Sequence, residues 1–107
     1  MKHDPRNPFT TFTRGVEGDV LWFLGRTHFQ ESASHIATMT ERSRSQVMAV
    51  LSYMVNTELV VVQRYEQWCG HRLNLHHPLT PLIRQMAKMK LSEDLPRTAH
   101  PLDAVDE

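Results

Sequence analysis

The sequence has 107 residues, of which 40% are apolar, and its 12 basic residues balance its 12 acidic ones. This length allows one small domain and excludes two full ones. The single cysteine excludes an internal disulfide bond, and no apolar stretch approaches the roughly 20 residues that span a bilayer, so we expect a soluble, cytoplasmic protein.

The zero net charge is the sum of two oppositely charged segments. Residues 1–90 hold 11 Lys and Arg against 7 Asp and Glu, a balance of +4, whereas residues 91–107 hold Arg97 against 5 acidic residues, a balance of −4. Both ends of the chain contain prolines, and their apolar residues do not recur at the regular spacing of a helix or strand. We therefore expect a flexible arm over residues 1–8, a folded domain over residues 9–90 and an acidic, disordered tail over residues 91–107.

Two helices are predicted in the first half of the domain. Apolar residues at helical spacing indicate a helix from about Gly15 to His28. A second, shorter helix is expected over Ala33–Thr40, with Ser32 as its N-cap.

The third helix has the clearest local signal. Ser43 and Gln46 form a capping-box pattern, which predicts a helix that begins there and ends at about Asn56 or Thr57. Apolar residues then recur at i, i+3, i+4 and i+7, which predicts a buried stripe of Val47, Val50, Leu51 and Met54. At 100° per residue the opposite face is small and polar, and it contains Arg42, Ser45, Ala49, Ser52 and Asn56, with Gln46, Tyr53 and Met48 at its edges.

A β-hairpin and a last helix are expected after it. Residues 59–67 are rich in β-branched and aromatic residues and alternate from Val62 onward, and residues 71–75 alternate again. A turn at Trp68–Gly70, where Gly70 is able to take a positive φ, would join the two strands. Thr80 followed by Pro81 predicts a capped helix to about Lys90. The fold class is thus mainly α with a small β-hairpin (α+β), in the order helix, helix, helix, strand, strand, helix.

This order of elements is typical of a winged helix-turn-helix, in which the outer face of the second helix of the tandem pair enters the DNA major groove. Residues 16–86 resemble winged helix-turn-helix regulators of the ArsR/MarR type, through the stretches SASHIATMTERSRSQVMAVLSYMVNTELVVVQRYE and HRLNLHHPLTPLI. The resemblance implies a bacterial DNA-binding transcription regulator, usually a homodimer on a near-palindromic site, and more often a repressor than an activator.

Candidate DNA-binding residues lie on the third helix and on the hairpin, which serves as the wing over residues 59–76. We expect the four arginines of the set to anchor phosphates. The residues expected to face base edges are Ser45, Gln46, Ala49 and Tyr53. Trp68 has two open interpretations: insertion into the minor groove, or packing back onto the strands. The predicted set is Arg42, Ser43, Arg44, Ser45, Gln46, Ala49, Tyr53, Arg64, Trp68, His71 and Arg72.

No cofactor, metal or enzymatic activity is predicted. Cys69, His71, His76 and His77 are close in sequence, but a hairpin projects alternate residues to opposite faces, and the sequence has no Gly-rich phosphate loop or nucleophile motif. We expect a homodimer through the last helix, at Leu82, Ile83, Met86 and Met89.

The alternative function is a winged-helix protein–protein interaction module without direct DNA binding. A further hypothesis concerns the acidic tail, which would compete with DNA for the basic surface of the domain.

Overall fold

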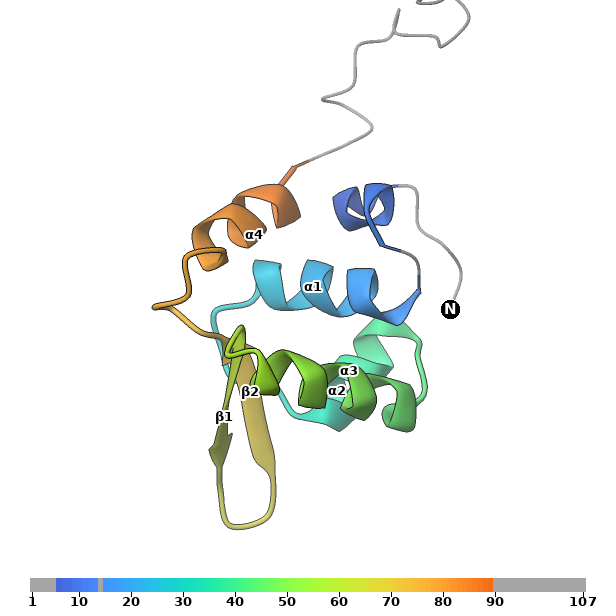
Figure 1. Cartoon of the computed structure of the whole chain (residues 1–107). Coiled ribbons are helices and arrows are strands. Elements are labelled where there is room, and N and C mark those ends of the chain that lie inside the picture. Colours follow the sequence, from blue (N-terminus) through green and yellow to red (C-terminus); the bar gives the residue numbers. More distant parts are fainter. Residues whose placement is uncertain (1–5, 14, 90–107) are drawn as a thin grey trace, which may run out of the picture.

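The computed structural model describes residues 6–13 and 15–89, which form four α-helices, a short 3-10 helix and one two-stranded antiparallel sheet (Figure 1). The expected acidic tail and most of the expected arm lie outside the described residues. The elements follow in the order η1 (Pro8–Thr11), α1 (Val16–Arg26), α2 (Ala33–Thr40), α3 (Arg44–Asn56), β1 (Val60–Arg64), β2 (Cys69–Leu73) and α4 (Thr80–Ala87). The predicted order of helices and strands is confirmed, with η1 added before them.

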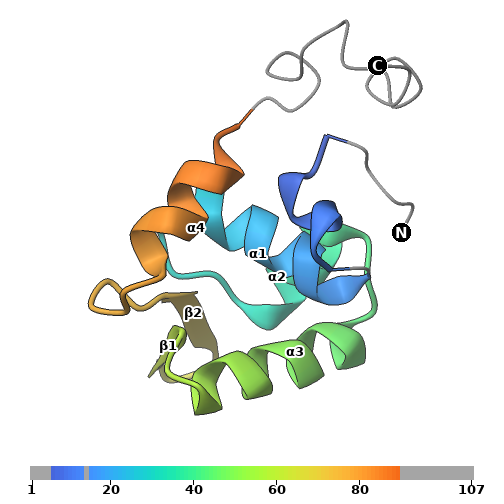
Figure 2. The ribbon, with the colours of Figure 1, turned by 45° about the horizontal axis from the view of Figure 1, so that its top comes forward.

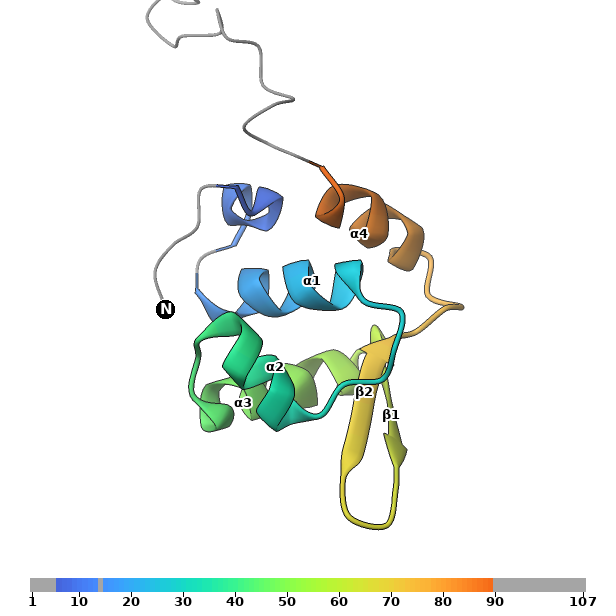
Figure 3. The same ribbon diagram turned by 180° about the vertical axis from the view of Figure 1, so that it is seen from behind.

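Helix α1 is central to the packing. Figures 1 and 3 show η1 and α4 on one side of it, and α2 and α3 on the other. Gly25 of α1 allows α4 to approach, since a Cβ built there would lie 2.6 Å from Cβ of Ala87. The buried apolar core draws on every element, and its members are Phe9, Val20, Leu24, Ala33, Ile36, Ala37, Val47, Val50, Leu51, Met54, Val60, Leu73, Ile83 and Ala87.

The helix-turn-helix is formed by α2, a short turn and α3. Ser32 caps α2 by accepting a hydrogen bond from the backbone N–H of His35, as predicted. Glu41 ends the helix in the left-handed region, with φ of 59° and ψ of 36°, which turns the chain sharply before Ser43 begins the next helix. The predicted inner stripe of α3 is confirmed, because all four of its apolar residues are buried.

The hairpin forms the wing. Strands β1 and β2 pair in antiparallel register, with Val62 opposite His71 and Arg64 opposite Cys69. The wing starts close to the C-terminal end of α3 (Figure 2) and extends beyond the helices (Figure 3). The expected turn at Trp68–Gly70 is wrong: Gly70 lies inside β2, paired with Gln63, and its φ is not positive.

Two further expectations need correction. Thr80 is the first residue of α4 and not its N-cap, because its hydroxyl donates to the backbone carbonyl of Asn74. Asn7 and Pro8, which the sequence assigns to the arm, are buried. The Asn7 side chain donates to the carbonyl of Gly18 at 3.2 Å and accepts from the N–H of Phe9 at 2.9 Å, which anchors the start of the packed chain to α1.

None of the helices in the described part of the chain is long and apolar enough to cross a membrane.

Candidate nucleic-acid interface

The capping box fixes where α3 begins, and therefore which of its residues lie on the exposed outer face. The Ser43 hydroxyl accepts from the N–H of Gln46 at 3.2 Å, and the Gln46 side-chain oxygen accepts from the N–H of Ser43 at 3.1 Å. These bonds satisfy two backbone donors that a helix N-terminus leaves unpaired. With the inner stripe buried, the predicted DNA-facing residues Ser45, Gln46, Ala49 and Tyr53 are all exposed.

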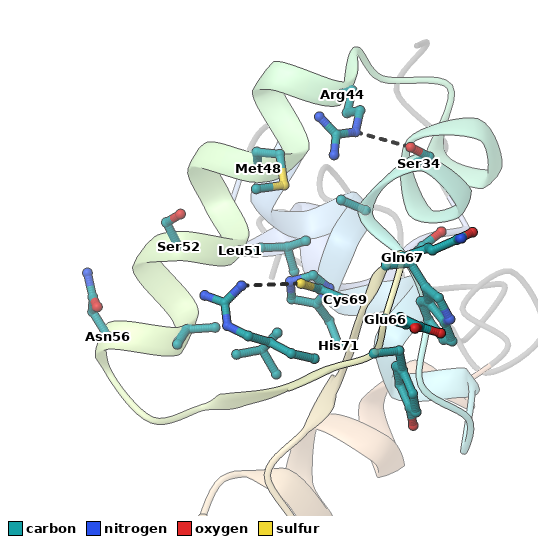
Figure 4. Close-up of a pocket in the computed structure, with 17 residues that line it drawn as sticks. Ser34, Arg44, Met48, Leu51, Ser52, Asn56, Glu66, Gln67, Cys69 and His71 are labelled. Carbon is teal, nitrogen blue, oxygen red and sulfur yellow. Dashed lines mark hydrogen bonds between the residues drawn. The ribbon is translucent and has the colours of Figure 1, made fainter.

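A groove of about 840 Å³ lies between α3 and the wing (Figure 4). Arg44, Met48, Ser52 and Asn56 follow one another along the side of α3 that lines it. Their spacing of four residues places them on one helical face. The opposite wall comes from the wing, through Val62, Arg64, Tyr65, Glu66, Gln67, Trp68, Cys69 and His71.

Two of the predicted phosphate anchors line this groove from opposite elements. Arg44 belongs to α3, and its Nε donates to the Ser34 hydroxyl of α2 at 3.1 Å (Figure 4). Arg64 belongs to β1, and its Nη1 lies 3.6 Å from Sγ of Cys69. Both side chains are exposed. The groove therefore carries positive charge on two elements, with Glu66 as the acidic residue among those that line it.

The wing is fastened to the loop between α1 and α2. Backbone hydrogen bonds join Glu31 and His71 in both directions, at 2.9 and 2.8 Å. Further out, the Gln30 side chain donates to Gln63 at 3.1 Å and accepts from the Tyr65 hydroxyl at 2.6 Å. We expect this attachment to hold the wing at a fixed distance from α3.

Trp68 packs back onto the wing. Its ring stacks on Tyr65 with centroids 4.6 Å apart and an angle of 13° between the planes. The side chain is still 44% exposed. Of the two interpretations left open by the sequence, the structure favours packing on the strands.

His71 is misplaced in the predicted DNA-binding set. It is only 6% exposed, because its strand also bridges to Glu31 and this closes its outer side. Its ring Nδ1 lies 3.2 Å from the Glu31 carbonyl, an acceptor, so this nitrogen carries the proton. Burial lowers the pKa of His71 below 6.5, and the hydrogen bond to Glu31 opposes this in part.

Arg42 also lies apart from the groove. It falls in the turn before α3, where its Nε donates to the Asp19 carboxylate of α1 at 2.8 Å. The two side chains are only 17% and 6% exposed. Its guanidinium is thus engaged in holding the helix-turn-helix to α1, which makes it a poor phosphate anchor.

Arg72 occupies the other face of the wing. It pairs with Val61, and side chains alternate along a strand, so it points away from the face that carries Val62 and Arg64. The side chain is partly exposed. It can reach a phosphate only on the far side of the hairpin.

The face made by η1 and α4 lies on the opposite side of α1 from α3 (Figure 1). Of the four residues predicted to form a dimer surface, Leu82 and Met89 are 55% and 41% exposed, Met86 is partly buried, and Ile83 belongs to the core. Phe12, which follows η1, is 76% exposed.

Within residues 6–13 and 15–89, no group of three or more His, Cys, Asp or Glu side chains is placed to hold a metal ion.

No protein-family model matches this chain, and no curated protein matches it in sequence. Solved structures do match. The homodimeric winged helix-turn-helix DNA-binding domain of Mb0332 from Mycobacterium bovis, a possible ArsR-family transcriptional regulator, is 16% identical with a TM-score of 0.59, and the match covers 94% of this chain and 97% of that one.

The multiple antibiotic-resistance repressor MarR from Listeria monocytogenes is 8% identical with a TM-score of 0.55, and the match covers 94% of this chain and 73% of the repressor. Together with the order of elements, these likenesses show that the chain has the winged helix-turn-helix fold predicted from its sequence.

Proposed function

We propose that this protein is a sequence-specific DNA-binding transcriptional regulator, a cytoplasmic, nucleoid-associated repressor that acts as a homodimer. Helix α3 would enter the major groove, and the wing would lie on the backbone or the minor groove. The observation that carries this proposal is the pair of exposed arginines, Arg44 and Arg64, which line one groove from α3 and from the wing.

The geometry of α3 supports the proposal. The helix has no acidic residue, its outer face is polar and small, and a B-DNA major groove about 12 Å wide admits a helix of this kind. A phosphate strand that passes between α3 and the wing would meet Arg44 on one side and Arg64 on the other. The N-terminal end of the helix adds a favourable dipole for a nearby phosphate.

The dimer would form on the face opposite to the DNA. Phe12, Leu82 and Met89 expose apolar surface there, on the far side of α1 from α3. A second copy bound at this face would leave both groove surfaces free. Substitution of Leu82 by Glu should shift the protein towards monomer in sedimentation equilibrium, and a wild-type protein that stays monomeric at high concentration would contradict the dimer.

One observation favours the alternative of a protein-binding module. The groove also exposes apolar side chains, with Met48 and Val62 each 36% exposed and Trp68 44% exposed. A partner protein could bind this surface through apolar contacts. Such a complex would depend weakly on salt, because it neutralises few phosphates or none.

Selection from a pool of randomised DNA duplexes tests the proposed function. We expect enrichment of a near-palindromic site whose binding weakens steeply with added salt, by a slope of about −0.9 per neutralised phosphate in a log–log plot. An absence of binding to any duplex at low salt would refute the DNA-binding function and favour the protein-binding module.

A further inference from the structure

The outer face of α3 has few kinds of functional group that could contact the edge of a base. Apart from Asn56, which lines the groove at the C-terminal end of the helix, its exposed residues are hydroxyls, one amide and apolar groups: Ser45, Gln46, Met48, Ala49, Ser52 and Tyr53. Arg44 is the one cation of α3, and its Nε is turned towards Ser34 of α2. The outer face of α3 therefore has no carboxylate and no long cation of its own, since Arg44 lies on the side of the helix that lines the groove.

The capping box leaves the Gln46 side chain able to donate a hydrogen bond to a base but not to accept one. Its side-chain oxygen accepts from both the N–H and the hydroxyl of Ser43, each at 3.1 Å. A glutamine that recognises adenine with two hydrogen bonds needs this oxygen as an acceptor. While the cap is formed, the NH₂ group is the part of the Gln46 side chain that is left to bond to a base. The methyl group of Ala49 lies one turn further along the same side of the helix.

Of the four bases, thymine is the best match to a donor beside a methyl group. In the major groove thymine shows the O4 acceptor next to its 5-methyl group, whereas cytosine shows an N4 donor and no methyl group. Guanine is read most strongly by arginine or lysine, and a carboxylate is the usual acceptor for cytosine. The outer face of α3 lacks both.

We propose that α3 recognises thymine in A·T base pairs, with Ala49 in contact with the 5-methyl group and Gln46 donating to O4. This inference rests on the proposed function and adds the base that the helix selects. Ala49 and Gln46 are then specificity-determining residues, and Arg44 and Arg64 supply affinity without reading sequence.

Deoxyuridine provides the test, since it keeps O4 and lacks the 5-methyl group. The probe is the duplex recovered by selection, with each thymine replaced in turn by deoxyuridine. At one or more positions we expect binding about fourfold weaker, which corresponds to ~0.8 kcal/mol for one buried methyl group.

The variant Ala49→Ser adds a hydroxyl to the contacting methyl group, which makes this contact polar, and the position is exposed, so the fold should be kept. We expect this variant to bind the thymine and deoxyuridine duplexes with nearly equal affinity. The matched control is Thr38→Ser, which removes a methyl group from an exposed position on α2 and should keep the fourfold difference.

Three results would overturn the inference in distinguishable ways. A selected site with G·C pairs and no deoxyuridine effect would overturn thymine recognition while leaving DNA binding in place. If Ala49→Ser still binds the deoxyuridine duplex fourfold more weakly than the thymine duplex, Ala49 is not the residue that contacts the 5-methyl group. A protein that selects no duplex at all would overturn the proposed function, and the inference with it.

Discussion

Substitution of Arg42 by alanine should destabilise the fold, although the sequence places Arg42 among the DNA contacts. In the structure its guanidinium pairs with Asp19 at 2.8 Å. The Asp19 carboxylate is only 6% exposed, and its other partner is the side-chain amide of Asn7 at 3.4 Å. The Arg42→Ala variant would leave a buried negative charge with one long hydrogen bond.

The burial of the ion pair determines how much unfolding free energy the Arg42→Ala variant should lose. Removal of one partner of a buried ion pair costs about 3–5 kcal/mol, because the remaining charge stays desolvated. The Arg42 side chain is 17% exposed and Asn7 still donates, so we expect the low end of this range, about 3 kcal/mol. For a domain of this size such a loss lowers the melting temperature by about 12–24 °C.

Urea unfolding followed by circular dichroism measures this loss directly. The matched control is Arg44→Ala, an exposed arginine two residues further along, whose loss should change stability by less than about 1 kcal/mol. The double variant Asp19→Asn with Arg42→Met removes both charges and should recover most of the stability. A stability loss in Arg42→Ala no larger than that in Arg44→Ala would refute this reasoning.

Three other substitutions probe the packing and the wing. Because burial lowers the pKa of His71, the unfolded chain binds a proton at this histidine at a higher pH than the folded chain does. The stability that the neutral, buried His71 contributes is therefore full above about pH 6.5 and declines below it. The His71→Asn variant should show a smaller fall in unfolding free energy between pH 7.5 and 5.5 than wild type. Gly25→Ala should cost about 1–3 kcal/mol, since the new Cβ would meet Ala87 at 2.6 Å, and an unchanged urea midpoint would argue against this close packing. Ser43→Ala should cost about 1 kcal/mol in thermal unfolding through loss of the cap, whereas no loss would mean that α3 starts without it.

The parts of the fold that depend on neighbouring residues could be predicted from the sequence. The Ser43–Gln46 spacing predicted where α3 begins, and the apolar spacing predicted which face of the helix is buried, because a helix brings residues three and four positions apart onto one face. Alternation predicted the hairpin, but not that its turn comes before Gly70.

The contacts between distant segments could not be predicted in the same way. Nothing near Arg42 in the sequence indicates that it pairs with Asp19, which lies 23 positions earlier. The burial of His71 depends on a bridge to Glu31, 40 positions away, in a loop with no regular pattern. The candidate site is affected most, because the groove exists only once the wing is fastened beside α3.

The measurement that tests DNA binding through this groove most directly is the salt dependence of binding to the selected duplex, compared between wild type and the double variant Arg44→Ala with Arg64→Ala. If both arginines contact phosphates, the log–log slope should become shallower by about 1.8, since each phosphate contributes about 0.9. Lys88→Ala, which removes an exposed charge on the far side of α1 next to α4, should leave the slope unchanged. Equal slopes for wild type and the double variant would contradict DNA binding in the groove between α3 and the wing.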